Sequence, residues 1–427
     1  MAIVQLSSTN PHFSFILQKN PSSGMQLKPI RKGTVFGWYS TPQTYNVYFK
    51  DADNDLSYPQ YKEESFEYLN TTRYNSPLFP LNAISDFFST TLKKVHEKDQ
   101  PGYKNEFLIN MIYVPNERYL HYFKNHFPHV SFTFEKITEK NYRVLIVSET
   151  TLHELVHLAY VFSLFLALSS DEYVEMSNQP IEKYIRSIQA IDAPYYIRYL
   201  FVRHVLTNKK LLHEYKEQLE KTERYYSITF SFGHTALQRR NWIESQLAFN
   251  KPIVDIGCGE GFYAIPFSKK LTETPYYAID INKNIIENLN KKVKEKELKN
   301  ITTFTSFESF LNHYKNRECV HVLMTEVVEH MDVQAATNLI QNILGNVAFE
   351  TFIITTPNRD FNIFYQLEND RRHEDHYWEM DTKEFQHWLN SIIDLTKFSI
   401  TFSNVGDEVN GISITQAAII RRKDGTV

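Results

Sequence analysis

KPIVDIGCGEG, residues 251–261, is an apolar run that passes directly into a loop with three glycines. The run predicts a buried β-strand over residues 251–256, and the loop predicts a tight turn that opens a helix. Glycines are needed where the backbone turns sharply and approaches a ligand closely. A second strand is predicted over residues 276–281. Asp280 lies at its end, where a carboxylate can accept hydrogen bonds from both hydroxyls of a ribose.

The glycine loop differs from that of the dinucleotide-binding fold, the main alternative for a strand–loop–helix unit. That fold needs the spacing GxGxxG, whereas this loop reads GCGEG. The preceding Asp255 would repel phosphates but suits the positively charged methionine end of S-adenosylmethionine. The predicted cofactor-binding residues are Asp255, Gly257, Gly259, Gly261 and Asp280. Thr305 and Ser306, after the third predicted strand, are candidates for the adenine side, and a helix cap is the open alternative.

The region around this loop alternates strands and helices. A helix rich in Lys and Glu is predicted over residues 285–298. Further strands are predicted over residues 301–304, 320–324 and 351–355, and a terminal antiparallel pair over residues 398–403 and 411–420. Strands separated by helices favour a parallel, doubly wound sheet. Seven strands with a final hairpin are the arrangement of the class I (Rossmann-like) methyltransferases, so we expect that α/β fold here.

Candidate metal ligands follow the fourth predicted strand. Glu326, Glu329 and His330 are spaced i, i+3 and i+4, which on a helical turn would place them on one side. Two carboxylates and an imidazole suit Mg²⁺, Mn²⁺, Fe²⁺ or Co²⁺ better than Ca²⁺. The segment RRHEDHYWE, residues 371–379, follows the fifth strand and can deliver a further imidazole, His376, to the same sheet edge. An ordinary acidic surface turn is the alternative.

The N-terminal half has a different pattern. Residues 1–150 alternate short apolar runs with turn residues, which predicts a mainly β region with one helix near residues 80–96. The predicted strand segments are residues 12–17, 34–39, 45–49, 106–114 and 130–134. From residue 150 to 226 the pattern is helical, and a charged helix over residues 210–222 leads to the domain boundary. We therefore predict a mixed α+β domain over residues 1–225 and a methyltransferase domain over residues 226–427.

Composition limits where such a protein works and what it binds. The sequence has 427 residues and two cysteines, which excludes a disulfide framework and fits the cytoplasm. The N-terminus lacks the pattern of a secretory signal, and residues 158–168 suit a buried helix better than a membrane span. The net charge of −4 lacks the basic excess of proteins that grip long duplexes. If nucleic acid is bound, we expect short local contact, as at a strand end.

The combination of these motifs resembles a known enzyme family. The glycine loop, EVVEH at residues 326–330, TPN at residues 356–358 with Asn362, and RRHEDHYWE resemble the Hen-type RNA 3′-terminal ribose 2′-O-methyltransferases. One departure is that the family usually shows FEW after the DH pair, where this chain has Trp378-Glu379-Met380. Residues 11–20, 74–89, 157–168 and 181–202 resemble the extra N-terminal domain of the bacterial form.

The resemblance implies a site and a reaction. It implies one divalent metal, Mg²⁺ or Mn²⁺, held by Glu326, Glu329, His330 and His376. The metal would polarise the 2′-hydroxyl of an RNA end with a free 2′,3′ diol. It further implies a role in RNA repair, with the N-terminal domain binding or activating a polynucleotide kinase–phosphatase–ligase. We hypothesise that His330 or His373 assists proton removal, and that Arg371 and Arg372 contact terminal phosphates or form a solvated charge pair.

Two other functions are compatible with parts of the sequence. His153-Glu154-Leu-Val-His157 matches the HExxH pattern of zinc peptidases, although no third ligand is evident in the helix that follows. A metal-dependent small-molecule O-methyltransferase acting on a vicinal diol, such as a catechol, would share the metal and the diol. Its ligands are usually aspartates and asparagine rather than ExxEH.

Overall fold

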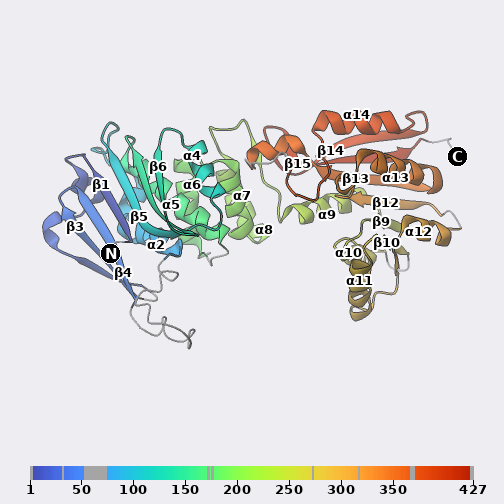
Figure 1. Cartoon of the computed structure of the whole chain (residues 1–427), viewed down its shortest axis with the longest axis horizontal. Helices are drawn as coiled ribbons and strands as arrows, with labels where there is room; N and C mark the ends of the chain where they lie inside the picture. The colour runs from blue at the N-terminus through green and yellow to red at the C-terminus, as the bar shows by residue number, and fades with distance from the viewer. Residues whose placement is uncertain are drawn as a thin grey trace. The chain divides into compact units, whose positions relative to one another are not determined.

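In the computed structural model the chain forms two compact units, Met1–Arg224 and Tyr225–Val427 (Figure 1). The division lies next to the boundary expected from the sequence. The structure describes residues 3–30, 33–51, 75–170, 174, 177–271, 274–315, 318–365 and 371–423. Residue 74, the first of the segment 74–89 named above, lies outside this set.

Unit 1 contains a seven-stranded sheet in which every recorded strand pair is antiparallel. In spatial order its strands are β2 (Gln26–Ile30), β3 (Gly33–Thr41), β4 (Thr44–Asp51), β1 (Val4–Ser8), β5 (Asn105–Tyr113), β7 (Asn141–Ser148) and β6 (Ser131–Thr138). Its helices are α1 (Phe13–Leu17), η1 (Pro21–Ser23), α2 (Leu78–Phe87), α3 (Ser89–Lys93), α4 (Arg118–His126), α5 (Leu152–Ser169), α6 (Asn178–Ala190), α7 (Tyr195–His204) and α8 (Lys209–Glu220).

Residues 12–17 are the clearest error of the sequence analysis in unit 1. They were expected to form a strand, but they form α1, whose Phe13, Ile16 and Leu17 are buried. The spacing of these apolar positions is helical, and a run this short does not separate the two periodicities. The other predicted strands and the helical region after residue 150 are present.

Helix α5 is long and apolar enough to cross a membrane by composition alone. However, 83% of that span is buried inside unit 1. The helix packs against α2, α6 and α7, as expected of a core helix.

Unit 2 is built on an eight-stranded sheet. In spatial order the strands are β11 (Ile301–Phe304), β10 (Tyr276–Ile279), β9 (Ile253–Ile256), β12 (Val320–Thr325), β13 (Phe349–Pro357), β15 (Ile412–Arg422), β14 (Phe398–Val409) and β8 (Ile228–Thr229). The first five are parallel, and β15 joins them antiparallel as part of a hairpin with β14. This confirms the class I methyltransferase fold.

Strand β8 is an addition to the seven expected strands. It is two residues long and pairs with the end of β14. The backbone N–H of Tyr226 donates to the Asn410 side chain beside it at 2.8 Å. Such a short edge strand has too few residues to show an alternating pattern, which is why the sequence did not predict it.

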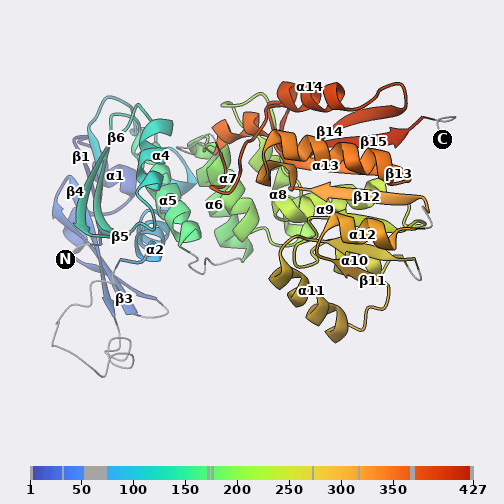
Figure 2. The same ribbon diagram turned by 45° about the vertical axis from the view of Figure 1, so that its right-hand side comes forward.

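Helices cover both faces of the unit 2 sheet. They are α9 (Thr235–Gln246), α10 (Ala264–Ser268), α11 (Lys283–Glu295), α12 (Phe307–His313), η4 (Val328–His330), α13 (Val333–Asn346), η5 (Arg359–Phe364) and α14 (Thr382–Ile392). One buried cluster joins α12, α13 and α14 to one face, and a second joins α9 and α10 to the other. In both ribbon views α11 and α14 lie at opposite ends of this unit (Figures 1 and 2).

Candidate active site

The glycine loop of unit 2 is held between two strand ends. Gly257, Gly259 and Gly261 all have positive φ, at 73°, 53° and 86°. The backbone N–H groups of Gly257 and Cys258 donate to the Ile279 carbonyl at the end of β10. A Cβ added to Gly257 would lie 2.3 Å from Cγ2 of Val327, so the loop lies directly against the turn that carries the candidate metal ligands.

Two aspartates lie next to this loop: Asp255 belongs to β9, and Asp280 directly follows β10. The Gly259 N–H donates to Oδ2 of Asp280 at 3.1 Å, which holds the loop over the end of β10. Asp255 is fully buried, accepts a hydrogen bond from the Tyr276 hydroxyl at 2.8 Å, and has an Oδ1 atom without a partner in the described chain. Burial raises its pKa to about 7, and the nearby charge of Asp280 adds to this. A cation close to these carboxylates would be favoured.

Ser306 serves as a helix cap, which was one of the two alternatives for Thr305 and Ser306. Its side chain accepts from the Ser309 N–H at 3.0 Å and begins α12. Thr305 beside it is exposed. Contact of either residue with an adenine stays a prediction.

Three of the four predicted metal ligands meet at the end of β12. One ligand atom each of Glu329, His330 and His376 lies within 4.8 Å of the others. Glu329 is fully buried; its Oε2 accepts from the Thr356 hydroxyl at 3.1 Å, and its Oε1 has no partner in the described chain. Burial, with the neighbouring Glu326 charge, raises the Glu329 pKa well above its usual value. A bound cation would satisfy this carboxylate, so these donors fit a divalent metal.

Glu326 does not lie in this group, and the expectation of one shared helical turn was wrong. Glu326 has a φ of 55°, which reverses the chain before the short 3₁₀ turn η4. Its Oε2 pairs with Arg239 Nη1 at 3.1 Å, and its Oε1 accepts from Thr355 at 3.1 Å. Burial of Arg239 works to lower its pKa, but Glu326, Tyr263 and Glu329 together outweigh burial and raise the Arg239 pKa above its usual value. Arg239 comes from α9, far away in sequence, so spacing alone could not predict this pair.

The sequence analysis missed a carboxylate that orients His376. Glu379 is buried, and its Oε1 lies 2.7 Å from Nδ1 of His376. Asn362 donates to the other oxygen of Glu379 at 2.7 Å, and the Arg372 N–H donates to Oε1 at 2.7 Å. A carboxylate on one imidazole nitrogen leaves the other facing a metal and makes it more basic. The i, i+3 spacing of His376 and Glu379 was the available signal.

We expect Glu379→Gln to weaken metal binding by roughly 10- to 100-fold, because it removes the charge that orients and polarises His376. Isothermal titration with Mn²⁺ would measure this without any turnover. Glu374→Gln, an exposed change in the same segment, is the matched control. Equal Mn²⁺ affinity in the Glu379 and Glu374 variants would contradict the orienting role.

The remaining polar residues of this segment divide between the site and the fold. His373 is exposed with its ring 5.0 Å from that of His376, and Nδ1 of His330 lies 3.3 Å from Asp375. A part in proton removal for either histidine stays a prediction. Arg372 instead donates to Asn362 and to two backbone carbonyls, all at 2.6–2.7 Å. It therefore braces the loop, which argues against the predicted phosphate contact for this residue.

The HExxH motif of α5 is part of the core of unit 1. Nδ1 of His157, which is fully buried, lies 2.8 Å from the Ser187 hydroxyl, and Nδ1 of His153 lies 2.6 Å from the Thr91 carbonyl. Glu154 points elsewhere and pairs with His129 at 3.3 Å. Among the described residues no three ligands converge at this motif. The geometry favours packing over peptidase chemistry.

Acid is expected to destabilise unit 1 through His157. Burial, with the nearby His153 and Arg186 charges, lowers its pKa to about 3. The unfolded value is near 6.5, so the stabilisation is complete above pH 6.5 and is lost as the pH falls toward 3. This amounts to about 1.5 kcal/mol between pH 6.5 and 5. Urea titrations read by hydrogen exchange of α5 peptides would measure it; His157→Gln should flatten the slope, and an unchanged slope would contradict the assignment.

The strand order, the glycine loop and the acidic end of β10 define unit 2 as a class I S-adenosylmethionine-dependent methyltransferase domain. In agreement, residues 253–347 match a general methyltransferase domain model. Residues 3–224 match the family model of the Hen1 N-terminal domain, which covers more than half of the sequence. The chain therefore belongs to the Hen1 family.

Solved and curated relatives agree with this assignment. A chain of the "Structure of the Pnkp1/Rnl/Hen1 RNA repair complex" is similar over 98% of this chain and 100% of its own, with 26% identity and a TM-score of 0.80. Curated small RNA 2′-O-methyltransferases are similar over shorter regions. The protein of Caenorhabditis elegans is 38% identical over 17% of this chain and 16% of its own. That of Schizosaccharomyces pombe is 24% identical over 36% and 47%. This chain thus spans less than half the length of these curated relatives.

Proposed function

We propose that this protein transfers the methyl group of S-adenosylmethionine to the 2′-hydroxyl of the 3′-terminal ribose of RNA, with one divalent metal, Mg²⁺ or Mn²⁺. The observation that carries the proposal is the convergence of Glu329, His330 and His376 within 4.8 Å, on a turn that contacts the glycine loop through Val327. The similar small RNA 2′-O-methyltransferases support the choice of substrate.

The residues of the glycine loop fit S-adenosylmethionine. All three glycines have positive φ, and an added Cβ at Gly259 would meet nothing within 4 Å, so space is open there. Asp255 and Asp280 favour a positively charged ligand. Because Val327 packs on the loop, a ligand held by the loop would lie close to the turn that follows β12. The cofactor supplies an electrophilic methyl group, and the chain supplies its orientation.

The ligand group fits a vicinal diol. A divalent cation bound by Glu329, His330 and His376 would lower the pKa of the 2′-hydroxyl. Glu379 orients His376. Glu326 lies close enough to Glu329 for its charge to act on it, and Glu326 is itself paired with Arg239. His373 is the exposed imidazole beside the ligand group that could take the proton, because His330 serves as a metal ligand in this proposal. Recognition of the diol requires no base readout and restricts the reaction to an RNA end.

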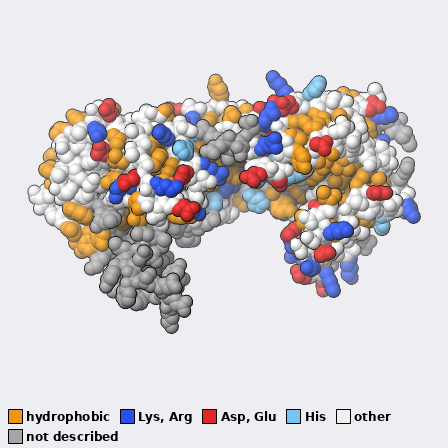
Figure 3. Space-filling view, viewed as in Figure 1, with side chains coloured by type: hydrophobic (Ala, Val, Ile, Leu, Met, Phe, Trp, Pro, Cys, Tyr) orange, Lys and Arg blue, Asp and Glu red, His pale blue; other side chains and the backbone are white. Residues whose placement is uncertain are grey.

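The surface is consistent with such local contact. The face drawn in Figure 3 mixes positive and negative side chains without a continuous basic stripe, and the net charge is −4. Sequence-independent binding of a long duplex depends on clustered Lys and Arg side chains. We therefore propose that only a few terminal nucleotides are held.

Unit 1 is proposed to bind and activate a polynucleotide kinase–phosphatase–ligase partner during RNA repair. The support is the similarity of nearly the whole chain to one found in an RNA repair complex. Co-purification of the two full-length proteins and ligation assays with and without this chain would test it. Neither binding nor stimulation of ligation would contradict it.

The reaction itself is tested with a short RNA, labelled S-adenosylmethionine and Mn²⁺. We expect label only in RNA with a free 3′ diol, none with a 2′-deoxy or 3′-phosphate end, and none after adding EDTA. Catechol replaces RNA in a parallel sample and tests a small-molecule diol as substrate. Label in the 2′-deoxy RNA, or equal label with EDTA, would overturn the proposal.

A further inference from the structure

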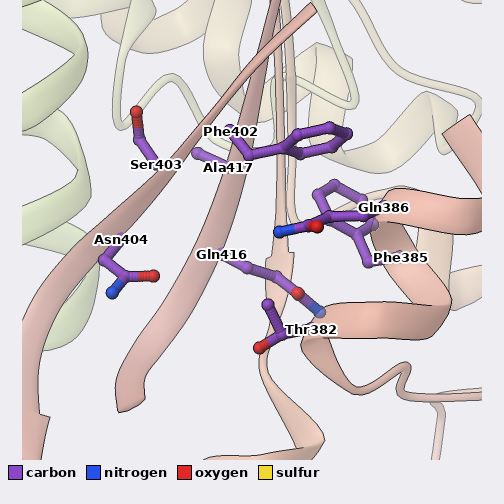
Figure 4. A pocket seen from close by; sticks show the side chains of 8 residues that line it. All are labelled: Thr382, Phe385, Gln386, Phe402, Ser403, Asn404, Gln416 and Ala417. Atoms are coloured by element: carbon purple, nitrogen blue, oxygen red, sulfur yellow. The ribbon is translucent and has the colours of Figure 1, made fainter. Parts of the chain in front are cut away.

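A pocket of about 270 Å³ lies between the first turns of α14 and the strands β14 and β15. The side chains that matter for its chemistry are those of Thr382, Phe385, Gln386, Phe402, Asn404 and Gln416. Figure 4 shows the two phenylalanine rings toward one end and the polar groups of Asn404, Gln416 and Thr382 toward the other. None of the site residues predicted from the sequence lines this pocket.

The pocket lies on the same sheet edge as the candidate metal ligands. Across neighbouring strands Thr356 is in register with Gln416, and Gln416 with Asn404. Thr356 is also the residue whose hydroxyl donates to Glu329. Two strand spacings, about 10 Å, therefore separate the Thr356 position from that of Asn404. This is within reach of the base of a nucleotide whose ribose lies at Glu329.

Hydrogen bonds connect the two places. Asn358, just beyond the end of β13, donates to the Thr382 hydroxyl at 3.2 Å. Gln416 donates through Nε2 to the carbonyls of Pro357 and Met380 at 3.2 and 2.8 Å. These hydrogen bonds connect Thr382 and Gln416, which line the pocket, to the end of β13 and to Met380. Met380 directly follows the segment that carries His376.

The lining is aromatic and amide-rich but uncharged. None of the described residues that line it is Lys, Arg, Asp or Glu, so a phosphate or a cation would find no counter-charge there. Phe402 is half-exposed and packs edge-on against the buried Phe385, with ring centroids 6.0 Å apart. Exposed aromatic faces stack on bases, and Asn and Gln amides can donate to and accept from base edges.

We propose that this pocket receives the base of the 3′-terminal nucleotide while its ribose lies at the Glu329 group. The inference rests on the proposed function and specifies how the RNA end is held. The volume is below the roughly 300–1,000 Å³ of sites for drug-sized ligands, so it suits one ring system. Because amides both donate and accept, the pocket accepts any base.

The test compares two RNAs that both keep the terminal 2′,3′ diol. One ends in uridine, and the other ends in an abasic ribose with hydrogen at C1′. For the wild-type chain we expect a KM roughly tenfold higher for the abasic RNA, with kcat unchanged, because a stacked base is lost. The double variant that combines Asn404→Ala and Gln386→Ala should have a KM several-fold higher for the uridine RNA, and an unchanged KM for the abasic RNA.

Controls separate the pocket from the fold and from the metal site. Phe402→Leu keeps an apolar side chain but removes the ring, and should show the same substrate-dependent effect. Asn390→Ala, an exposed change on α14 outside the pocket, should change neither KM. Mn²⁺ affinity should stay constant in all these variants.

The outcomes distinguish the two proposals. Equal KM values for both RNAs in the wild type, or variant effects of equal size on both, would overturn the pocket and leave the methyltransferase proposal standing. Methylation of neither RNA in the presence of Mn²⁺ would overturn both.

Discussion

Glu329→Ala is expected to abolish methyl transfer to RNA ends, lowering kcat/KM by at least about 10³-fold. Glu329 is the fully buried member of the candidate ligand group, and its free Oε1 has no other partner in the described chain. Its loss would remove one of the three ligands that meet there. Binding of S-adenosylmethionine should be nearly unchanged, because the glycine loop and Asp280 are untouched.

Three measurements make this result interpretable. Methyl transfer gives the loss of activity, Mn²⁺ titration gives the loss of metal affinity, and S-adenosylmethionine titration shows that the fold is intact. Glu374→Ala, an exposed carboxylate of the segment that carries His376, should keep full activity. Full activity in the Glu329 variant would refute the metal assignment.

Gly257→Ala is expected to weaken S-adenosylmethionine binding by well over tenfold and to lower methyl transfer with it. The φ of 73° at Gly257 disfavours any residue with a Cβ, at a cost of about 1–2 kcal/mol. The added Cβ would also lie 2.3 Å from Val327 Cγ2, a separation that forces the cofactor loop or the ligand turn to move. The alanine side chain at position 257 therefore disturbs both the cofactor loop and the turn that carries the candidate metal ligands.

A double variant separates these two causes. Val327→Ala removes the atom that the new Cβ would meet, so Gly257→Ala with Val327→Ala should recover part of the cofactor affinity but not the part due to positive φ. Gly345→Ala in α13, where an added Cβ meets nothing within 4 Å, should keep full affinity. No recovery in the double variant would show that the contact between the loops contributes nothing.

The fold of unit 2 was largely predictable because its signals are local. The central strands β9, β10 and β12 are short, buried and mostly apolar runs, and the glycine loop marks the first crossover. Unit 1 was harder to predict, since residues 12–17 are too few to separate a helix from a strand. In unit 2 the added strand β8 is too short to show a period.

The site was predictable in its residue types but not in its geometry. Glu329, His330 and His376 follow strands whose carboxyl ends share one sheet edge, so their meeting follows from topology. The direction of Glu326 depends on Arg239, and that of His376 on Glu379 and Asn362. These partners come from other elements and have no spacing that a sequence pattern could report.

The sequence alone determined the class of fold, the cofactor loop and the set of candidate ligands, because these depend on local periodicity and on where strands end. The tertiary structure decided which carboxylate faces the ligand group, which arginine braces the loop, and that a neutral pocket lies beside it. Those features depend on packing between residues distant in sequence, where burial and charge pairing select one arrangement among many that the same sequence pattern allows.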